Sequence, residues 1–159
     1  MEKILSIIET QPLLTPAQIA AMVDRTEQEV SDIIEQCKRD GIIKGYRTLI
    51  DWDKVSTNHV KALIELRVSP KKGRGFEEIA QTVASMPEVE AVTLISGGYD
   101  LLVEIKAKSF QEIAMLVAKR LSPLDDVNGT KTNFVLRPYK VSGIPFIEED
   151  KDERGFDFL

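Results

Sequence analysis

Two nine-residue stretches of the chain repeat each other, and they constrain its fold more than any other feature. FEEIAQTVA at 76–84 and FQEIAMLVA at 110–118 lie 34 residues apart and share Phe, Glu, Ile, Ala, Val and Ala in register. In each stretch Phe, Ile, Ala and Val recur at i, i+3, i+4 and i+7, which predicts a helix with one apolar stripe. Because the two stripes are alike, we expect both helices to pack against the same kind of surface.

Strand patterns surround the two predicted helices. In HVKALIELRV at 59–68 the even positions are apolar and the odd ones mostly polar, which predicts a strand with one buried face. VEAVTLIS (89–96), YDLLVEIKA (99–107) and KTNFVLRPY (131–139) are also predicted strands. The order β-α-β-β-α-β with an internal repeat is typical of a ferredoxin-like antiparallel sheet with two helices on one face. We expect a second copy of the sheet to cover the other face, so the sequence predicts a homo-oligomer.

The first third of the chain has helical periodicity instead. A capping box begins the second predicted helix at Thr15 and the third at Thr26, and Asp24-Arg25 alone separates the two helices. So short a connection predicts a steep crossing, as in a helix-turn-helix. The apolar stripes of the three helices are Ile4, Leu5 and Ile8; Ile19, Ala20 and Val23; and Val30, Ile33, Ile34 and Cys37.

A small hairpin is predicted after the third helix. Gly41 is expected to end that helix, and IIKGYRTLID at 42–51 to form two short strands folded back near Gly45. Three helices and a hairpin make a winged helix-turn-helix, and a three-helix bundle with an unrelated hairpin is the alternative. The predicted class is therefore α+β, with a winged helix-turn-helix and linker at 1–58, a ferredoxin-like domain at 59–147 and an acidic tail at 148–159.

Composition argues against several classes of protein. Cys37 and His59 are the only residues of their types, so one chain cannot build a disulfide framework or a Cys/His zinc site. We expect no metal, no cofactor and no enzymatic activity. The chain has no apolar run near the roughly 18 residues that span a bilayer, and its first residues lack the layout of a signal peptide. We therefore expect a cytoplasmic protein with no membrane partner.

The charge of the chain is unusual for a protein that binds DNA. The net charge of -5 divides into -3 over 1–58, +2 over 59–147 and -4 over 148–159, so no segment is strongly basic. The third predicted helix lies in RTEQEVSDIIEQCKRDG at 25–41, which carries five acids against three bases. A nucleic-acid binder usually has a basic face, so composition alone argues mildly against one.

Taken together, these motifs resemble the Lrp/AsnC family of leucine-responsive or feast/famine regulators over residues 1 to about 143. The predicted winged helix followed by GIIKGYRTLID is similar to the family's DNA-binding half. SGGYDLLVEI and VNGTKTNFVLRPYK are similar to its C-terminal half, the RAM/AsnC-type amino-acid-sensing domain. Members are transcription regulators that form dimers through these sheets and commonly octamers. The resemblance implies a sequence-specific DNA-binding regulator whose effector is a small metabolite of the amino-acid class.

The resemblance also implies an effector site. The family's Gly-x-aromatic-Asp turn falls on Gly97, Gly98, Tyr99 and Asp100, and Thr130 and Thr132 match positions near the family's effector pocket. Glycines allow φ > 0 and close approach of backbone N–H groups to a ligand, and an acid offers a partner to an α-amino group. The alternative is structural: the two glycines make a two-residue hairpin turn and Asp100 caps its end.

Double-stranded DNA is the other expected partner. On the third helix Gln and Ser can reach base edges, and Lys and Arg nearby can neutralise phosphates. The predicted DNA-binding residues are Arg25, Thr26, Gln28, Ser31, Lys38, Arg39, Lys44 and Arg47. Family members usually carry more bases on this helix, so we expect binding that is weak per dimer and sensitive to salt.

Two other functions stay open at this point. The first is an oligomeric ligand-binding protein whose degenerate winged helix binds DNA weakly or not at all. The second is an enzyme, because haem-pathway decarboxylases resemble the same two-part architecture. An enzyme of that kind would need basic and histidine side chains gathered in the C-terminal pocket, and His59 with scattered bases gives little sign of them.

Overall fold

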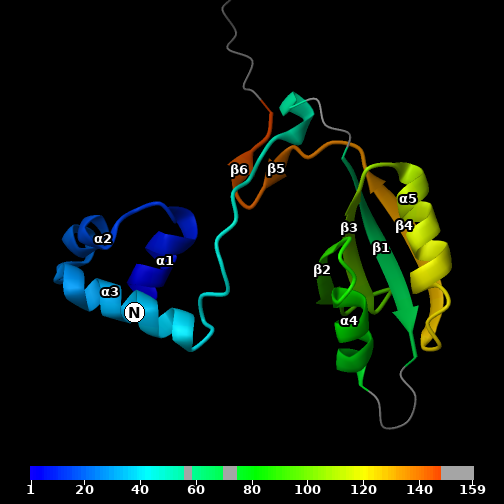
Figure 1. The fold of residues 1–159 in the computed structure, drawn as a ribbon, viewed down its shortest axis with the longest axis horizontal. Helices are drawn as coiled ribbons and strands as arrows, with labels where there is room; N and C mark the ends of the chain where they lie inside the picture. The colour runs from blue at the N-terminus through cyan, green and yellow to red at the C-terminus, as the bar shows by residue number, and fades with distance from the viewer. Residues whose placement is uncertain (56–58, 70–74, 148–159) are drawn as a thin grey trace, which may run out of the picture. The chain divides into compact units, whose positions relative to one another are not determined.

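A computed structural model describes residues 1–55, 59–69 and 75–147 of the chain. The chain divides into two compact units, Met1–Leu49 and Ile50–Leu159, which are helical and sheet-containing respectively (Figure 1). The division precedes a short 3-10 helix, η1 (Trp52–Val55), which the sequence analysis assigns to the first domain. The predicted acidic tail at 148–159 lies outside the described residues. Within those residues, no helix has both the length and the apolar character needed to cross a bilayer.

The first unit contains the three predicted helices, α1 (Glu2–Thr10), α2 (Pro16–Val23) and α3 (Glu27–Arg39). Both predicted capping boxes form, with Thr15 and Thr26 each accepting from the backbone N–H three residues later. Gly41 follows α3 with φ +66, so the predicted glycine end of that helix is confirmed. The predicted stripes meet in one core, whose buried members are Ile4, Ile8, Ile19, Ala20 and Val30.

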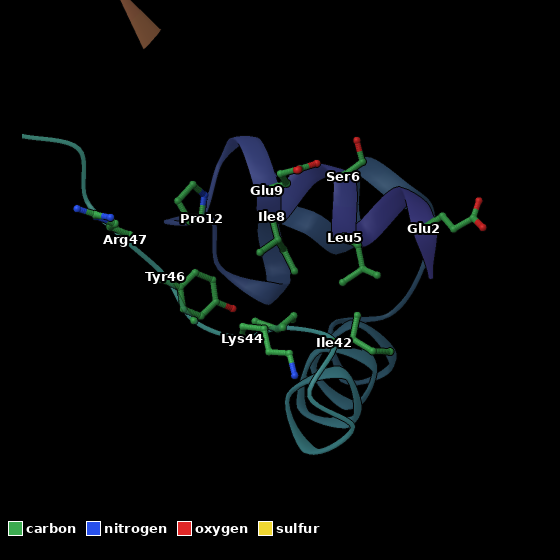
Figure 2. A pocket seen from close by; sticks show the side chains of 12 residues that line it. Glu2, Leu5, Ser6, Ile8, Glu9, Pro12, Ile42, Lys44, Tyr46 and Arg47 are labelled. Atoms are coloured by element: carbon green, nitrogen blue, oxygen red, sulfur yellow. The ribbon is translucent and has the colours of Figure 1, made fainter. Parts of the chain in front are cut away.

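The predicted hairpin at 42–51 is absent from the structure, and that prediction is wrong. Residues 42–50 are described and contain no strand. A tight hairpin at Gly45 would normally use positive φ in its turn, and Gly45 does not have it. The segment instead runs along α1, whose Leu5 and Ile8 point toward Ile42, Lys44 and Tyr46 (Figure 2). Contact with α1 therefore takes the place of pairing within the segment.

The second unit has the predicted order of strands and helices: β1 (Val60–Val68), α4 (Phe76–Ala84), β2 (Val89–Leu94), β3 (Leu101–Ala107), α5 (Phe110–Leu116) and β4 (Val127–Val135). The four strands form an antiparallel sheet in the order β2-β3-β1-β4, which is the ferredoxin-like arrangement. A π-helix, η2 (Val117–Leu121), continues α5. A two-stranded ribbon of β5 (Lys140–Val141) and β6 (Ile144–Pro145) follows.

The last strand of the sheet begins four residues earlier than predicted, at Val127 and not at 131. Its pairing with β1 sets these limits, because β4 runs beside β1 from Val68↔Val127 to Lys61↔Val135. The register shifts between Arg67 and Val68, so Asn128 is an extra residue in β4 and forms a bulge. Periodicity alone does not reveal a bulge, and the prediction missed the start of the strand for that reason.

The two faces of the sheet differ as the alternation in β1 predicts. Ala62, Ile64, Leu66 and Val68 are buried beneath α4 and α5 in the larger core (Figure 1). The opposite face is mixed: Leu63 and Leu102 lie on it beside Glu65, which accepts from Lys131 at 3.0 Å and from Asn133 at 2.8 Å. The lysine contact, and after it the asparagine, lowers the pKa of Glu65. This face thus combines apolar side chains with paired charges, and α4 and α5 do not cover it.

Candidate functional site

The predicted DNA-binding residues lie on and around α3. Most of their polar side chains already make contacts with residues close in sequence. Arg25 Nη1 lies 3.7 Å from Glu29 Oε1, and Lys38 Nζ lies 2.8 Å from Glu35 Oε1. Further along the helix, the Arg39 guanidinium donates to Gln36 Oε1 at 2.7 Å, and Gln28 Nε2 donates to Asp32 Oδ1 at 2.9 Å. Thr26 is the N-cap, and Ser31 is half-buried, so it is less outward than predicted.

The acids of α3 have identifiable partners. The Thr26 backbone N–H, and then its hydroxyl, holds the pKa of Glu29 below its ordinary value. The hydrogen bond from Lys38 lowers the pKa of Glu35 and raises that of Lys38 in return. Exposed ion pairs of this kind contribute at most about 1 kcal/mol, so a phosphate can replace the carboxylate at small cost. The bases of α3 are thus engaged in weak local pairs that a polyanion can exchange.

Lys44 and Arg47, the remaining predicted contacts, lie on the segment that follows α3. With Tyr46 they line a cavity of about 600 Å³ against α1 (Figure 2). Glu2 and Glu9 line the same cavity, so its walls carry both signs of charge. The structure therefore gives no purely basic surface here.

The predicted effector residues gather at one end of the sheet. The Asp100 backbone N–H donates to the Leu66 carbonyl at 2.9 Å, and Thr130 is the register partner of the same Leu66 from the opposite side. β3 and β4 flank β1, so Asp100 and Thr130 are separated by two strand spacings, roughly 10 Å. Thr132 pairs with Ile64, two residues further into the sheet. The predicted residues thus come from two segments, the loop that ends at Asp100 and β4, which lie on either side of β1.

The turn that carries the glycines differs from both expected forms. Leu94 pairs with Leu101, and the Ile95 N–H donates to the Asp100 carbonyl at 2.8 Å, which leaves a four-residue loop at 96–99 and not a two-residue turn. Neither Gly97 nor Gly98 has positive φ, so the expectation of left-handed backbone there is wrong. Both glycines are exposed and Tyr99 is half-buried.

Asp100 has a structural role, but not the one given as the alternative. Its Oδ2 accepts from the Val68 N–H at 2.8 Å, which ties the end of β1 to the start of β3. The side chain therefore caps β1, a strand 32 residues away, and not its own turn. Within the described ranges its Oδ1 makes no hydrogen bond, so one oxygen stays available to a donor.

Sequence reasoning missed Asp126, which lies at the same end of the sheet. Its backbone carbonyl accepts from the Ser69 N–H at 2.9 Å, so Asp100 and Asp126 bind the consecutive amides of Val68 and Ser69. Asp126 Oδ1 is buried and has no hydrogen-bond partner in the structure. Buried polar atoms are nearly always hydrogen-bonded, so this oxygen is an exception that points to an absent donor. In the described ranges, no group of three or more His, Cys, Asp or Glu is placed to hold a metal ion.

Comparison with known proteins identifies relatives of the whole chain. A model of the Lrp/AsnC ligand binding domain matches residues 61–145. An uncharacterised HTH-type transcriptional regulator of Bacillus subtilis, YugG, is 39% identical over 153 residues, which is 96% of this chain and 92% of that protein. The proline dehydrogenase transcriptional activator of Rhizobium radiobacter is 23% identical over 142 residues, 89% of this chain and 90% of that protein.

Solved structures agree on the fold. A transcriptional regulator of Neisseria meningitidis in complex with L-Met covers 89% of this chain and 91% of its own, with a TM-score of 0.70 and 22% identity. AsnC of E. coli covers 87% of this chain and 91% of its own, with a TM-score of 0.65 and 18% identity. These relatives are transcriptional regulators, as the sequence predicts for this chain, and not enzymes.

Proposed function

Because the chain belongs to the Lrp/AsnC family of transcriptional regulators, we propose that it binds operator DNA through α3 and responds to an amino acid bound at the Asp100 end of its sheet. The match to a regulator over 96% of the chain carries this proposal, since it spans both units. In this proposal the helical unit binds DNA and the sheet-containing unit binds the effector.

The DNA-binding part depends on α3 as the second helix of a helix-turn-helix. Asp24 has φ 54 at the end of α2, and Thr26 caps α3. Only residues 24–26 therefore join the two helices, as in a helix-turn-helix. Gln28 and Ser31 can reach base edges, while Arg25, Lys38, Arg39, Lys44 and Arg47 supply phosphate contacts.

A binding experiment with the gene's own upstream region tests this part. The fragment should be retained selectively at low salt and progressively less toward physiological salt. Arg25→Ala and Arg47→Ala should weaken binding about uniformly across sequences and each flatten the salt dependence, as phosphate contacts do. A protein that retains no fragment selectively at any salt concentration would contradict the proposal.

The effector part is supported by acceptors that the fold leaves without a donor. These acceptors are Asp100 Oδ1 and the buried Asp126 Oδ1, at the end of β1. Thr130, on the opposite side of β1, has a long hydrogen bond of 3.5 Å to Ser122 Oγ. An α-ammonium group donates three hydrogen bonds and carries the charge that these carboxylates need. The L-Met bound to the Neisseria relative supports an amino acid as the ligand class.

Thermal shift with the twenty amino acids tests the effector part. Asp100→Asn keeps an oxygen that can accept from Val68 and removes the negative charge, so the fold should survive while the ligand-induced shift disappears. Thr130→Val is the matched variant on the opposite strand and should reduce the shift. If Asp100→Asn responds like the wild type, Asp100 serves only the turn.

Assembly is the third part of the proposal: a homodimer through the face of the sheet that α4 and α5 leave open, where Leu63 and Leu102 lie beside paired charges, with the octamer as the next step. The paired charges Glu65 and Lys131 support a polar interface that a twin face can complement. Molar mass by light scattering tests it, and a strictly monomeric protein at micromolar concentration would contradict it.

One observation favours the second candidate, a ligand-binding protein whose degenerate winged helix binds DNA weakly or not at all. The α3 pairs Arg25–Glu29 and Lys38–Glu35 leave that helix with little uncompensated positive charge. A ligand-dependent thermal shift without any DNA retention would support this candidate over the first.

A further inference from the structure

The outer side of α5 is unusually apolar for a helix face in contact with solvent. Phe110 and Met115 are 55% and 43% exposed, and Ala114 and Ala118 are exposed as well. Phe110 and Ala114 lie four residues apart and are therefore neighbours on the surface of the helix. The buried stripe of the repeat lies on the other side of α5, in the core of the sheet unit. The helix thus has apolar side chains on both of its sides.

Two residues at the end of β4 extend this apolar area. β4 runs beside α5 (Figure 1), and Phe134 meets the Phe110 ring edge-on at 4.8 Å. Leu136 follows two residues later and is 90% exposed. We call Phe110, Ala114, Met115, Phe134 and Leu136 together the α5 surface. A contiguous apolar area on an otherwise polar exterior is typical of an interaction site.

The first copy of the repeat shows that the fold does not require this surface. In α4, the equivalent residues Phe76 and Ala80 pack against the core, and Gln81 occupies the position of Met115. The exposed residues at 77, 78, 81, 82 and 85 are Glu, Glu, Gln, Thr and Ser. Two helices with the same packing residues therefore differ on their outer sides, and the apolar outer side of α5 needs another explanation.

Basic side chains border the α5 surface. Lys108 and Lys119 flank α5 in the chain, Arg137 and Lys140 follow β4, and all four are exposed. Glu112 is an acid on the same helix, and its carboxylate accepts from the Lys108 N–H at 2.9 Å. Bases thus outnumber acids along this border in the part of the chain that the structure describes. An occupant of the surface should be apolar where it touches α5 and acidic around that contact.

The acidic tail has this composition. Residues 148–159 read EEDKDERGFDFL, with six acids against two bases and with Phe156, Phe158 and Leu159 following the main acidic run. Aromatic side chains bury a large apolar area at a contact, and the acids complement the bases beside the α5 surface. The chain therefore carries, within one short segment, both of the properties that the surface requires.

The tail also begins near enough to reach the α5 surface. The Phe146 N–H donates to the Tyr139 carbonyl at 2.9 Å, so the chain returns beside Tyr139 just before the tail begins. Tyr139 is five residues from Phe134, a distance of at most about 18 Å. Phe156 is nine residues after Ile147, and an extended chain of that length spans up to about 30 Å. Chain length thus permits Phe156 to meet Phe134.

We propose that the acidic tail docks on the α5 surface of its own chain. Phe156 lies against the Phe110–Phe134 pair, the apolar residues after it lie along α5 toward Met115, and the acidic run lies beside the bases of the border. A short tether gives a segment an effective concentration of about 1 mM, so a contact with a Kd of about 0.1 mM is occupied roughly nine-tenths of the time. The inference depends on neither DNA binding nor an effector.

Oxidation of methionine by hydrogen peroxide, followed by mass spectrometry, measures whether the surface is covered. Met115 lies on the surface, and Met22 of α2, 47% exposed, is a control of similar exposure in the other unit. Phe156→Ser combined with Phe158→Ser in the full chain should oxidise Met115 about tenfold faster than the wild type, because the docked state protects it. The rate at Met22 should stay the same in both proteins.

Salt is a second variable in the same experiment. Added salt screens the attraction between the acids of the tail and the bases of the border, so oxidation of Met115 in the wild type should accelerate with ionic strength. In the double variant the rate should depend little on salt. The inference is overturned if Met115 oxidises at the same rate in the wild type and the double variant. Cover that survives the loss of both phenylalanines would come from another surface or another copy.

A disulfide test identifies the chain that supplies the tail. Ala114→Cys combined with Asp157→Cys, oxidised with glutathione disulfide, should form a bond within one chain, so the mass under denaturing, non-reducing conditions stays that of a single chain. Cys37 is buried and does not compete. Gln81→Cys with Asp157→Cys places the first thiol on α4 and should not cross-link. A bond between two chains, or equal cross-linking from α4, overturns the inference.

Discussion

The two halves of the sheet unit begin with the same helical pattern and then diverge. Ile79 in α4 and Ile113 in α5 occupy equivalent places in the repeat, and both are buried in the same core; Val83 and Val117 form a second such pair. After them α4 ends within a residue, whereas α5 continues into η2 and carries Arg120 to Glu88. The repeated residues specify packing, and the residues after the second copy of the repeat supply the arginine that reaches Glu88.

The starts of the two helices differ as well. Ser109 caps α5 by accepting from the Glu112 N–H at 3.2 Å, whereas Gly75 precedes α4 without a side-chain cap. Phe76 packs partly against the core, while Phe110 is 55% exposed and meets the Phe134 ring edge-on at 4.8 Å. The second half is thus better capped and carries an exposed aromatic pair that the first half lacks.

The largest expected effect tests the equivalence of the two stripes. Ile113→Ala and Ile79→Ala should each lower the free energy of unfolding by about 2 to 5 kcal/mol, because each leaves a cavity in a shared core. Urea denaturation followed by circular dichroism measures this loss. Leu13→Ala, at a side chain that is 94% exposed, is the control and should change stability by less than about 0.5 kcal/mol. If one isoleucine can be replaced at no cost, the halves do not share a core in solution.

A smaller effect tests the difference in capping. Ser109→Ala should lower the free energy of unfolding by about 1 kcal/mol. Gly75→Ser should raise it by a few tenths, roughly the difference between serine and glycine caps, because it creates the Ser-x-x-Glu pattern with Glu78 that α5 already has. The added Cβ would meet the Glu77 carboxylate, which is the end of a flexible side chain and can move. Melting temperature in the two variants measures both changes, and a destabilised Gly75→Ser would argue against the capping explanation.

The smallest effect concerns the ion pair between Glu88 of the first half and Arg120 of the second. Arg120→Gln should lower the free energy of unfolding by about 0 to 0.5 kcal/mol, since an exposed pair contributes little and salt screens it. A double-mutant cycle with Glu88→Gln isolates the coupling between the two side chains. A coupling well above about 1 kcal/mol would contradict this expectation and make the pair a structural clamp between the two halves.

Local features were predictable from the sequence because each depends on residues within one turn or one strand. Thr15 and Thr26 satisfy backbone donors three residues away, and Gly41 adopts its left-handed φ next to the helix that it ends. The strand alternation in β1 likewise reports which face is buried. Together with the 34-residue repeat, these signals were sufficient for the ferredoxin-like order of elements.

The failures have a common cause, which is that the partner of each misassigned group lies far away in sequence. Residues 42–51 have a strand-like composition but run along α1 and form no hairpin. The Asp100 carboxylate accepts a hydrogen bond from Val68 in β1 and not from its own turn. Asp126 carried no motif at all, because an unpaired buried oxygen is visible only once its neighbours are in place.

By itself, the sequence determined the helices, their caps, the buried face of the sheet and the resemblance to Lrp/AsnC regulators. Each of these depends on the spacing of nearby residues or on a repeat. Only the tertiary structure decided which oxygen of Asp100 is occupied, which acid Arg120 meets and which end of the sheet each lies at. Both contacts join residues 32 positions apart. Strand register and the bulge in β4 set such contacts, and a shift of one residue in register would give every one of these groups a different neighbour.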